Sequence, residues 1–155
     1  MNSSANKLEV KNSIDIQTDL GTVWDALVNP EKTKIYMFGC ETVSNWNVGD
    51  TLLWRGEYEG KPMDFVSGYI LEIEKNRKLK YSVIDPNAPY EKTPENHLDV
   101  TYELSFSNGA TTLTVTQDGF ENAADSEKRY QDVYNNGDGW NPILIEIKKL
   151  IESPS

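Results

Sequence analysis

The feature that most constrains the fold is one apolar stripe near the C-terminal end of the chain. Its members recur at helical spacing: Trp140, Ile143, Leu144, Ile147, Leu150 and Ile151. This spacing predicts an amphipathic helix. Between Thr51 and Phe120 the apolar residues instead alternate with polar ones, which is typical of strands. We therefore expect the helix to bury its stripe against a sheet that curves around it.

The composition indicates one domain spanning residues 1–155, because a chain of 155 residues can bury a sufficient core by itself. A net charge of -10 argues against nucleic acid and anionic membranes as partners. The single cysteine, Cys40, excludes an internal disulfide and favours the cytoplasm. Residues 1–7 are polar and predict a frayed end, neither signal peptide nor anchor.

The first forty residues predict a strand followed by two short helices. Alternation over residues 8–16 indicates a half-buried strand with Asn12 on its inner face. Thr18 or Asp19 can cap a helix from Leu20 to Val28, and Pro30 suits the first turn of a second helix.

Six further strands are expected before the C-terminal helix. They cover residues 41–45, 51–58, 63–73, 79–83, 97–107 and 110–120. Gly68 in the third of these ranges indicates a bend or bulge, and Asn108-Gly109 predicts a tight hairpin turn. The Pro-rich loop 85–96 is either a mobile lid or a tolerated insertion. A helix over 127–134 should be followed by a kink or interruption, because glycines and Pro142 oppose a continuous helix.

Several short motifs occur in an order that one known superfamily shares. They are Val23-Trp24-Asp25-Ala26-Leu27, Asn29-Pro30-Glu31, Trp46-Asn47-Val48-Gly49-Asp50, Trp54-Arg55-Gly56-Glu57, Gly68-Tyr69-Ile70-Leu71-Glu72-Ile73, Leu79-Lys80-Tyr81-Ser82, Val100-Thr101-Tyr102-Glu103-Leu104, Thr112-Leu113-Thr114-Val115-Thr116 and Gly139-Trp140. Over nearly its whole length the chain resembles the helix-grip superfamily of START (SRPBCC) and birch-pollen-allergen-like domains. Within it, the chain is most similar to the branch of homologues of the activator of the 90-kDa heat-shock protein ATPase.

The resemblance implies an α+β helix-grip fold, in which a seven-stranded antiparallel curved sheet wraps on a long C-terminal helix. Two short helices would lie between strands 1 and 2, and a cavity would lie between sheet and helix. Members of the superfamily bind lipids, hormones and polyketides, and some are cyclases or hydrolases. The chaperone-activating relatives carry an additional N-terminal domain, whereas the first strand here begins near Leu8, which argues against chaperone activation.

The sequence contains no reaction signature. Cys40 and the single histidine, His97, are 57 positions apart and do not form a metal-ligand cluster. His97 at the start of a strand beside a loop is expected to contact solvent. We therefore predict neither catalytic residues, nor a metal, nor a cofactor.

Candidate ligand-binding residues come from the two sides of the expected cavity. One wall would contain Trp140 and Leu144, with Ile143 and Ile147 of the same stripe, and the sheet would contribute Leu53, Phe65, Tyr69, Tyr81 and Tyr102. An aromatic set would suit either the cavity and its mouth or a filled core: Trp24, Trp46, Trp54, Trp140, Phe38 and Phe65, with Met63. Arg55 could orient a polar or acidic end of the guest. Alternatively, Arg55 pairs with a carboxylate, the tyrosine hydroxyls reach backbone or water, and the aromatic rings fill the core.

The leading hypothesis is a domain that binds a small apolar or amphipathic molecule. A stress-related or co-chaperone-like protein-interaction domain is the alternative, and a cyclase or hydrolase is a third reading. The protein is expected to be a monomer or a weak homodimer. A cavity of a few hundred cubic ångströms would favour ligand binding, whereas a filled interior with an exposed apolar patch would favour a protein partner.

Overall fold

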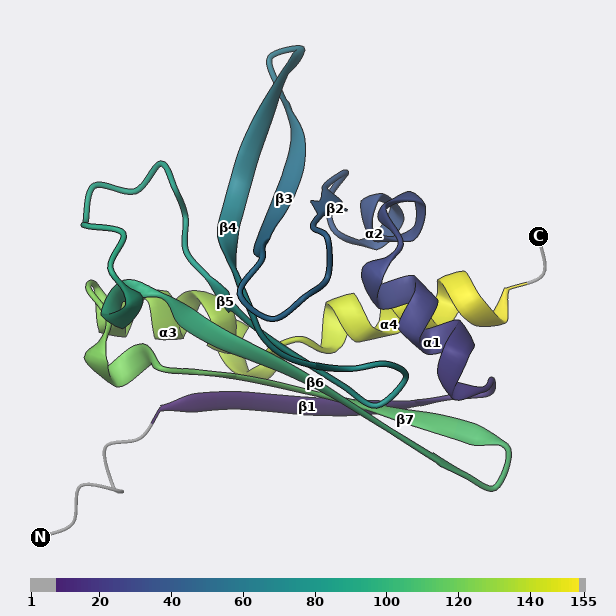
Figure 1. Ribbon diagram of the computed structural model, residues 1–155. Helices are drawn as coiled ribbons and strands as arrows, with labels where there is room; N and C mark the ends of the chain where they lie inside the picture. The colour runs from purple at the N-terminus through teal and green to yellow at the C-terminus, as the bar shows by residue number, and fades with distance from the viewer. Residues whose placement is uncertain (1–7, 154–155) are drawn as a thin grey trace, which may run out of the picture.

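The computed structural model describes residues 8–153, so the predicted frayed segment 1–7 lies outside the described residues. A seven-stranded antiparallel sheet has the order β1-β7-β6-β5-β4-β3-β2. Its strands are β1 (Glu9–Ile16), β2 (Glu41–Val43), β3 (Thr51–Tyr58), β4 (Lys61–Glu74), β5 (Lys78–Val83), β6 (Leu98–Ser107) and β7 (Ala110–Asp118). Figure 1 shows the β3–β4 hairpin rising steeply from the strands β1, β7 and β6, so the sheet is strongly bent.

Two short helices, α1 (Leu20–Val28) and α2 (Pro30–Tyr36), connect β1 to β2. The Asp19 carboxylate caps α1 by accepting a hydrogen bond of 2.8 Å from the Thr22 backbone N–H. Asn29 caps α2 in the same way, and Pro30 occupies its first turn, where no backbone N–H is needed. Both predicted helices are confirmed.

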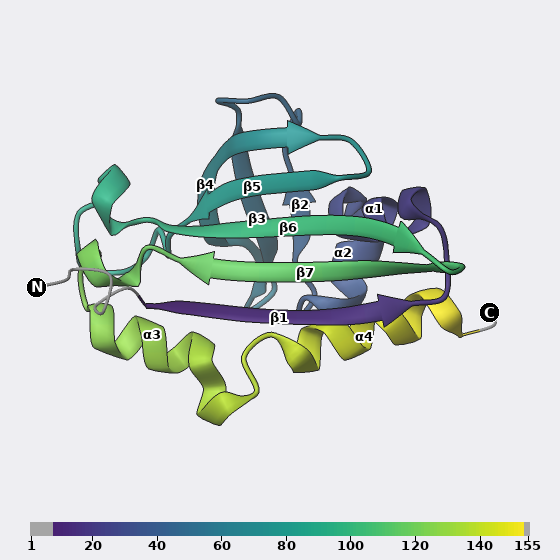
Figure 2. The ribbon, with the colours of Figure 1, turned by 90° about the horizontal axis from the view of Figure 1, so that it is seen from below.

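The hairpin between β6 and β7 turns at Asn108 and Gly109, whose φ angles are 53° and 81°. Positive φ at both positions is what a tight hairpin of this kind requires. From this turn the two strands pair without interruption, and β7 also pairs with β1 along the whole length of β1. Figure 2 shows these strands lying flat beside one another.

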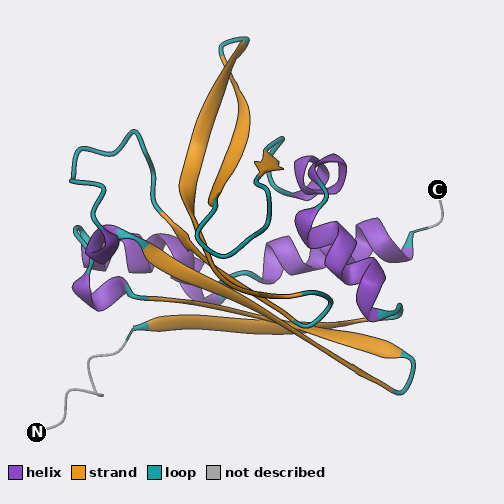
Figure 3. Cartoon of the chain, viewed as in Figure 1, coloured by secondary structure: helices purple, strands orange, loops and turns teal. Residues whose placement is uncertain are grey.

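The C-terminal segment is helical in two pieces. Helix α3 (Ser126–Tyr134) is followed by the 3-10 turn η4 (Asn135–Gly137) and then by α4 (Asn141–Glu152). The predicted interruption is therefore confirmed, and the apolar stripe lies on α4 and on Trp140 at its N-cap. Figure 3 shows this break in the helical ribbon. Two further 3-10 turns are η2 (Pro94–Asn96) in the long loop and η3 (Phe120–Asn122) after β7.

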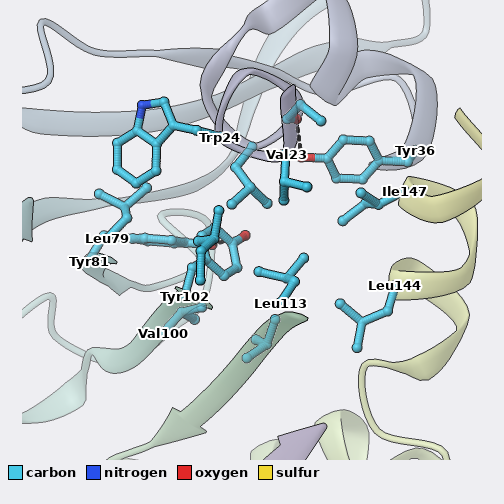
Figure 4. Packing of buried hydrophobic residues seen from close by; sticks show 14 of the residues in the cluster. Val23, Trp24, Tyr36, Leu79, Tyr81, Val100, Tyr102, Leu113, Leu144 and Ile147 are labelled. Atoms are coloured by element: carbon cyan, nitrogen blue, oxygen red, sulfur yellow. Dashed lines mark hydrogen bonds between the residues drawn. The ribbon is translucent and has the colours of Figure 1, made fainter. Parts of the chain in front are cut away.

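The main core lies between the concave face of the sheet and helices α1, α2 and α4. Leu144 and Ile147 of α4 are at most 1 % exposed. Figure 4 shows both pointing toward Leu113 of β7, with Val23 of α1 beside them. A second cluster, around Phe120, lies under α3. The expected grip of a curved sheet on the terminal helix is thus present.

Candidate functional site

A cavity of about 390 Å³ separates the corner after α2 from the bent part of the sheet. We call it the central cavity, and its lining residues are Met37, Phe38, Cys40, Trp54, Phe65, Val66, Tyr81, Val83, Val100, Gln117, Trp140 and Ile143. Most of these side chains are aliphatic or aromatic. The central cavity is of the size and character of a small-molecule site.

The bulge in β4 places two consecutive residues on the central cavity. Trp54 of β3 pairs with Val66 and Arg55 pairs with Asp64, so Phe65 is an extra residue without a partner in the ladder. As a result, Phe65 and Val66 both line the cavity. In a regular strand, neighbours would face opposite sides of the sheet.

The deep wall of the cavity is built from buried aromatic rings. Trp54 and Tyr81 have ring centroids 6.3 Å apart, Tyr81 and Tyr102 5.5 Å, and Tyr102 and Trp140 6.2 Å. The hydroxyls of Tyr81 and Tyr102 share a hydrogen bond of 2.7 Å. Burial raises the pKa of both phenols above the ordinary value, so both stay neutral.

Trp140 joins this wall to the start of α4. Its backbone N–H donates to Asn12 Oδ1 on β1 at 2.9 Å, which confirms the inward position predicted for Asn12. Its indole Nε1 donates to Gln117 Oε1 on β7, also at 2.9 Å. Gly139 lies so close to β1 that a Cβ there would be 2.3 Å from Asn12 Oδ1. The ring is therefore held from two strands.

The outer rim of the central cavity is the connection between α2 and β2. Phe38 has a φ of 56°, which is unusual for an aromatic residue, and its side chain is 87 % exposed. Cys40 lies further in, and burial raises the pKa of its thiol. Because Phe38 is the exposed member of the lining, it marks the side on which the cavity meets solvent.

The predicted site residues fall into three groups. Phe65, Tyr81 and Trp140 line the central cavity. Tyr102 and Leu144 are buried behind its wall and belong to the core. Leu53, Arg55 and Tyr69 do not line it.

The third group faces outward because of the way in which residues of β3 and β4 alternate between the two faces of the sheet. Leu52 and Trp54 are the buried residues of β3, so Leu53 and Arg55 face the other side. There the Arg55 guanidinium pairs with the Asp64 carboxylate at 2.7 Å, which raises the pKa of Arg55. Tyr69 is 48 % exposed and its ring lies beside that of His97. Leu53 and Tyr69 instead line a separate small pocket on this outer face.

Six lining residues were not among the candidates or the aromatic set named from the sequence: Met37, Cys40, Val66, Val83, Val100 and Gln117. Gln117 carried a signal in the sequence, because it continues the inward alternation of Leu113 and Val115 by one step. Val100 carried the same signal on β6. Val66 could not be found by alternation, because the bulge reverses the faces.

Among residues 8–153, no group of three or more His, Cys, Asp and Glu side chains could hold a metal ion. Within the same range, no helix is long and apolar enough to cross a membrane.

The curved antiparallel sheet, the helix pair after β1 and the terminal helix on the concave face define the class: an α+β helix-grip domain. The family model described as "Activator of Hsp90 ATPase homolog 1-like protein" matches residues 17–152. The chain belongs to this family, and the resemblance inferred from its motifs is confirmed.

Solved structures agree with this assignment. ChR145 from Cytophaga hutchinsonii is 34% identical, with a TM-score of 0.72 over 94% of both chains. An HSP90 activator from Plasmodium falciparum, PFC0360w, is 16% identical, with a TM-score of 0.67 over 93% of this chain and 95% of that one. The Aha1 dimer from Colwellia psychrerythraea is 13% identical, with a TM-score of 0.65 over 94% and 97%. The last two show similarity of fold alone. No curated protein matches the chain in sequence.

Proposed function

We propose that this protein binds a small, mainly apolar molecule in the central cavity. The observation that carries the proposal is a space of about 390 Å³ lined almost entirely by apolar side chains. Apolar pockets of a few hundred cubic ångströms are the usual form of small-molecule sites. Displacing water from such walls into bulk solvent favours an apolar guest.

Three of the residues predicted from the sequence would contact the guest. Phe65 and Tyr81 present ring surfaces from the sheet, and Trp140 presents its indole from the start of α4. Tyr102 and Leu144 would act from behind the wall by fixing the positions of these rings. Leu53, Arg55 and Tyr69 have no contact role in this proposal, because they lie outside the lining.

The experiment fills the cavity from one side and compares matched variants of α4. Ile143 lines the cavity, whereas Ile145 is 44 % exposed and does not. The probe is N-phenyl-1-naphthylamine, a neutral dye that fluoresces in apolar surroundings. We expect saturable binding to the wild type, at least about tenfold weaker binding to Ile143→Trp, and wild-type binding to Ile145→Trp.

Absence of saturable binding to the wild type, or equal binding to Ile143→Trp and the wild type, would contradict the proposal. Native mass spectrometry of the purified protein adds an independent readout, because a co-purified guest would appear as a mass increment that Ile143→Trp loses. Failure of both measurements would favour the alternative hypothesis, a protein-interaction domain.

The oligomeric state is part of the same proposal. The lining residues of a single chain already form the central cavity, so a monomer would be sufficient for binding, and a weak homodimer is compatible with it. One structural relative is described as a dimer. Light scattering with and without the dye should therefore give the same mass.

A further inference from the structure

The polar group that could select a guest is the Gln117 side chain. Gln117 lies on β7, two positions after Val115, and points to the concave face with only 7 % of its surface exposed. It lines the central cavity and also the smaller pocket beside the break between α3 and α4. A primary amide in this position can donate two hydrogen bonds and accept two.

Trp140 fixes the orientation of that amide. An indole N–H can only donate, so the Gln117 atom that faces Trp140 Nε1 at 2.9 Å must be Oε1. Nε2 consequently points away from the indole. Among residues 8–153, no group accepts a hydrogen bond from Nε2. Among the described residues, the fully buried side-chain polar atom without a partner is Asn76 Oδ1, and not Gln117 Nε2. Nε2 therefore reaches the accessible space of the pockets that Gln117 lines.

The remainder of the lining makes this donor selective. None of the described residues that line the central cavity carries a formal charge. Among the described residues that line the smaller pocket, the carboxylate is that of Asp132, and it pairs with Lys128 at 3.0 Å. A guest with a buried carboxylate would lack a cation to compensate its loss of hydration, whereas a neutral oxygen acceptor needs only one N–H donor.

We infer that the central cavity selects neutral, mainly apolar molecules that carry a carbonyl or ether oxygen, and that this oxygen accepts a hydrogen bond from Gln117 Nε2. The inference rests on the proposed function, since it specifies the guest of the same cavity. Gln117 is then the residue that sets specificity, and the aromatic walls supply most of the affinity.

The test compares guests of the same shape. 2-Acetylnaphthalene carries a carbonyl oxygen, 2-isopropenylnaphthalene replaces it with a methylene group, and 2-naphthoate carries a charged carboxylate. Their affinities are measured by displacement of N-phenyl-1-naphthylamine from the wild type, from Gln117→Met and from Gln131→Met. Gln131 lies exposed on α3, where it donates to Glu127, and serves as the matched control.

We expect the preference for the ketone over the hydrocarbon to fall about three- to tenfold in Gln117→Met and to stay unchanged in Gln131→Met. The hydrocarbon itself should bind Gln117→Met at least as well as the wild type, which separates lost recognition from a damaged wall. The carboxylate should bind the wild type at least about tenfold more weakly than the ketone.

If Gln117→Met does not fold, NMR of the wild type gives the answer. Saturation with the ketone should shift the Gln117 side-chain amide protons downfield, and saturation with the hydrocarbon should not. An equal ketone preference in both folded proteins, unshifted amide protons, or tighter binding of the carboxylate would overturn this inference while dye binding still supported the proposed function. Failure of the dye to bind the wild type would overturn the proposed function itself.

Discussion

The two hairpins on either side of β5 are built differently. β6 and β7 pair from Asp99 and Asp118 to the turn without any shift of register. β4 shifts register once against β3, at Phe65, and again against β5, between Ile70 and Glu72. The regular hairpin presents mostly packed side chains to the core and lines the central cavity with Val100 and Gln117. The bulged hairpin lines it with Trp54 and with the consecutive pair Phe65 and Val66.

This difference shows how the same strand-forming residues produce either a core or a cavity. A strand that alternates strictly presents one set of side chains to the interior, and neighbouring strands can then pack in layers. A bulge inserts an extra residue, bends the strand and increases its twist. Figure 1 shows the β3–β4 hairpin bent away from α4. Side chains of both elements line the central cavity, together with residues of the connection after α2 and of β5, β6 and β7.

The comparison predicts its largest effect for single-residue deletions. Deleting Phe65 should leave a folded protein, because Asp64 and Val66 already pair with consecutive residues of β3. Deleting Thr114 from β7 should abolish folding, because one flank of the strand must then turn its core residues outward. Circular dichroism and the dispersion of amide resonances distinguish the two results.

The deletion experiment has a quantitative part as well. Loss of the Phe65 ring should cost about 1–3 kcal/mol of the free energy of unfolding, since that ring is only partly buried. If the Phe65 deletion unfolded the protein as completely as the Thr114 deletion, the extra residue in β4 would be required for the fold.

The regular hairpin is also the part of the fold that the sequence predicted best. Strand alternation, the Asn-Gly turn and the helix caps are local signals, and each predicted element formed. The faces of β4 were predicted less well, because Phe65 and Tyr69 were both assigned to the cavity wall, and strict alternation puts Ile73 on the same face as these two residues. Two bulges separate them, so Phe65 and Ile73 pack inward while Tyr69 faces outward. The position of a bulge depends on tertiary pairing and leaves little trace in the strand itself.

The same limit applies to predicting the candidate site from the sequence. Tyr81 and Trp140 could be placed from the sequence because β5 is regular and the stripe of α4 is strong. Leu53 and Arg55 could not, because β3 carries Leu52 and Leu53 side by side and its apolar pattern therefore does not distinguish the two faces. Met37 and Phe38 lie in a connection with positive φ, for which a periodic pattern offers no guide.

A second effect is expected where the bulged strand crosses β5. A Cβ on Gly68 would lie 1.7 Å from the Ser82 carbonyl oxygen, so Gly68→Ala forces two backbones apart. We expect a loss of about 3 kcal/mol in the free energy of unfolding. Gly21→Ala in α1 is the matched control, because the nearest atom would be 3.7 Å away. Gly21→Ala should raise the free energy of unfolding by about 0.5–1 kcal/mol. Urea titrations measure both, and a neutral Gly68→Ala would show that the crossing can relax.

A third comparison uses one substitution in both hairpins. Val115 on β7 is fully buried in the core, so Val115→Ala should cost about 2 kcal/mol in the free energy of unfolding. Val66 lines the central cavity and already lacks packing partners on that side, so Val66→Ala should cost less than about 1 kcal/mol. If urea titrations gave the same loss in the free energy of unfolding for Val115→Ala and Val66→Ala, the central cavity would have to be closed in solution.

The last effect is expected at the seam between β5 and β6, where the Tyr81 hydroxyl meets that of Tyr102. Tyr81→Phe or Tyr102→Phe should each cost about 1–2 kcal/mol at neutral pH, because the remaining hydroxyl loses its partner. The double variant should cost less than the two single variants together, since it leaves no unpaired group. Tyr58→Phe, at an exposed position, should change nothing.

The same pair should also make stability depend on pH. Burial raises the pKa of Tyr81 and Tyr102, whereas the unfolded chain ionises these phenols near pH 10. The stability is therefore fully present below about pH 10 and falls as the pH rises toward the raised pKa, by about 1.4 kcal/mol per pH unit for each buried phenol. Urea titrations between about pH 10 and 11 measure how steeply the free energy of unfolding falls with pH. Each Phe substitution should remove the contribution of one phenol to this slope. Additive costs together with an unchanged slope would mean that water from the central cavity reaches both hydroxyls, and the wall between cavity and core would then be open at this seam.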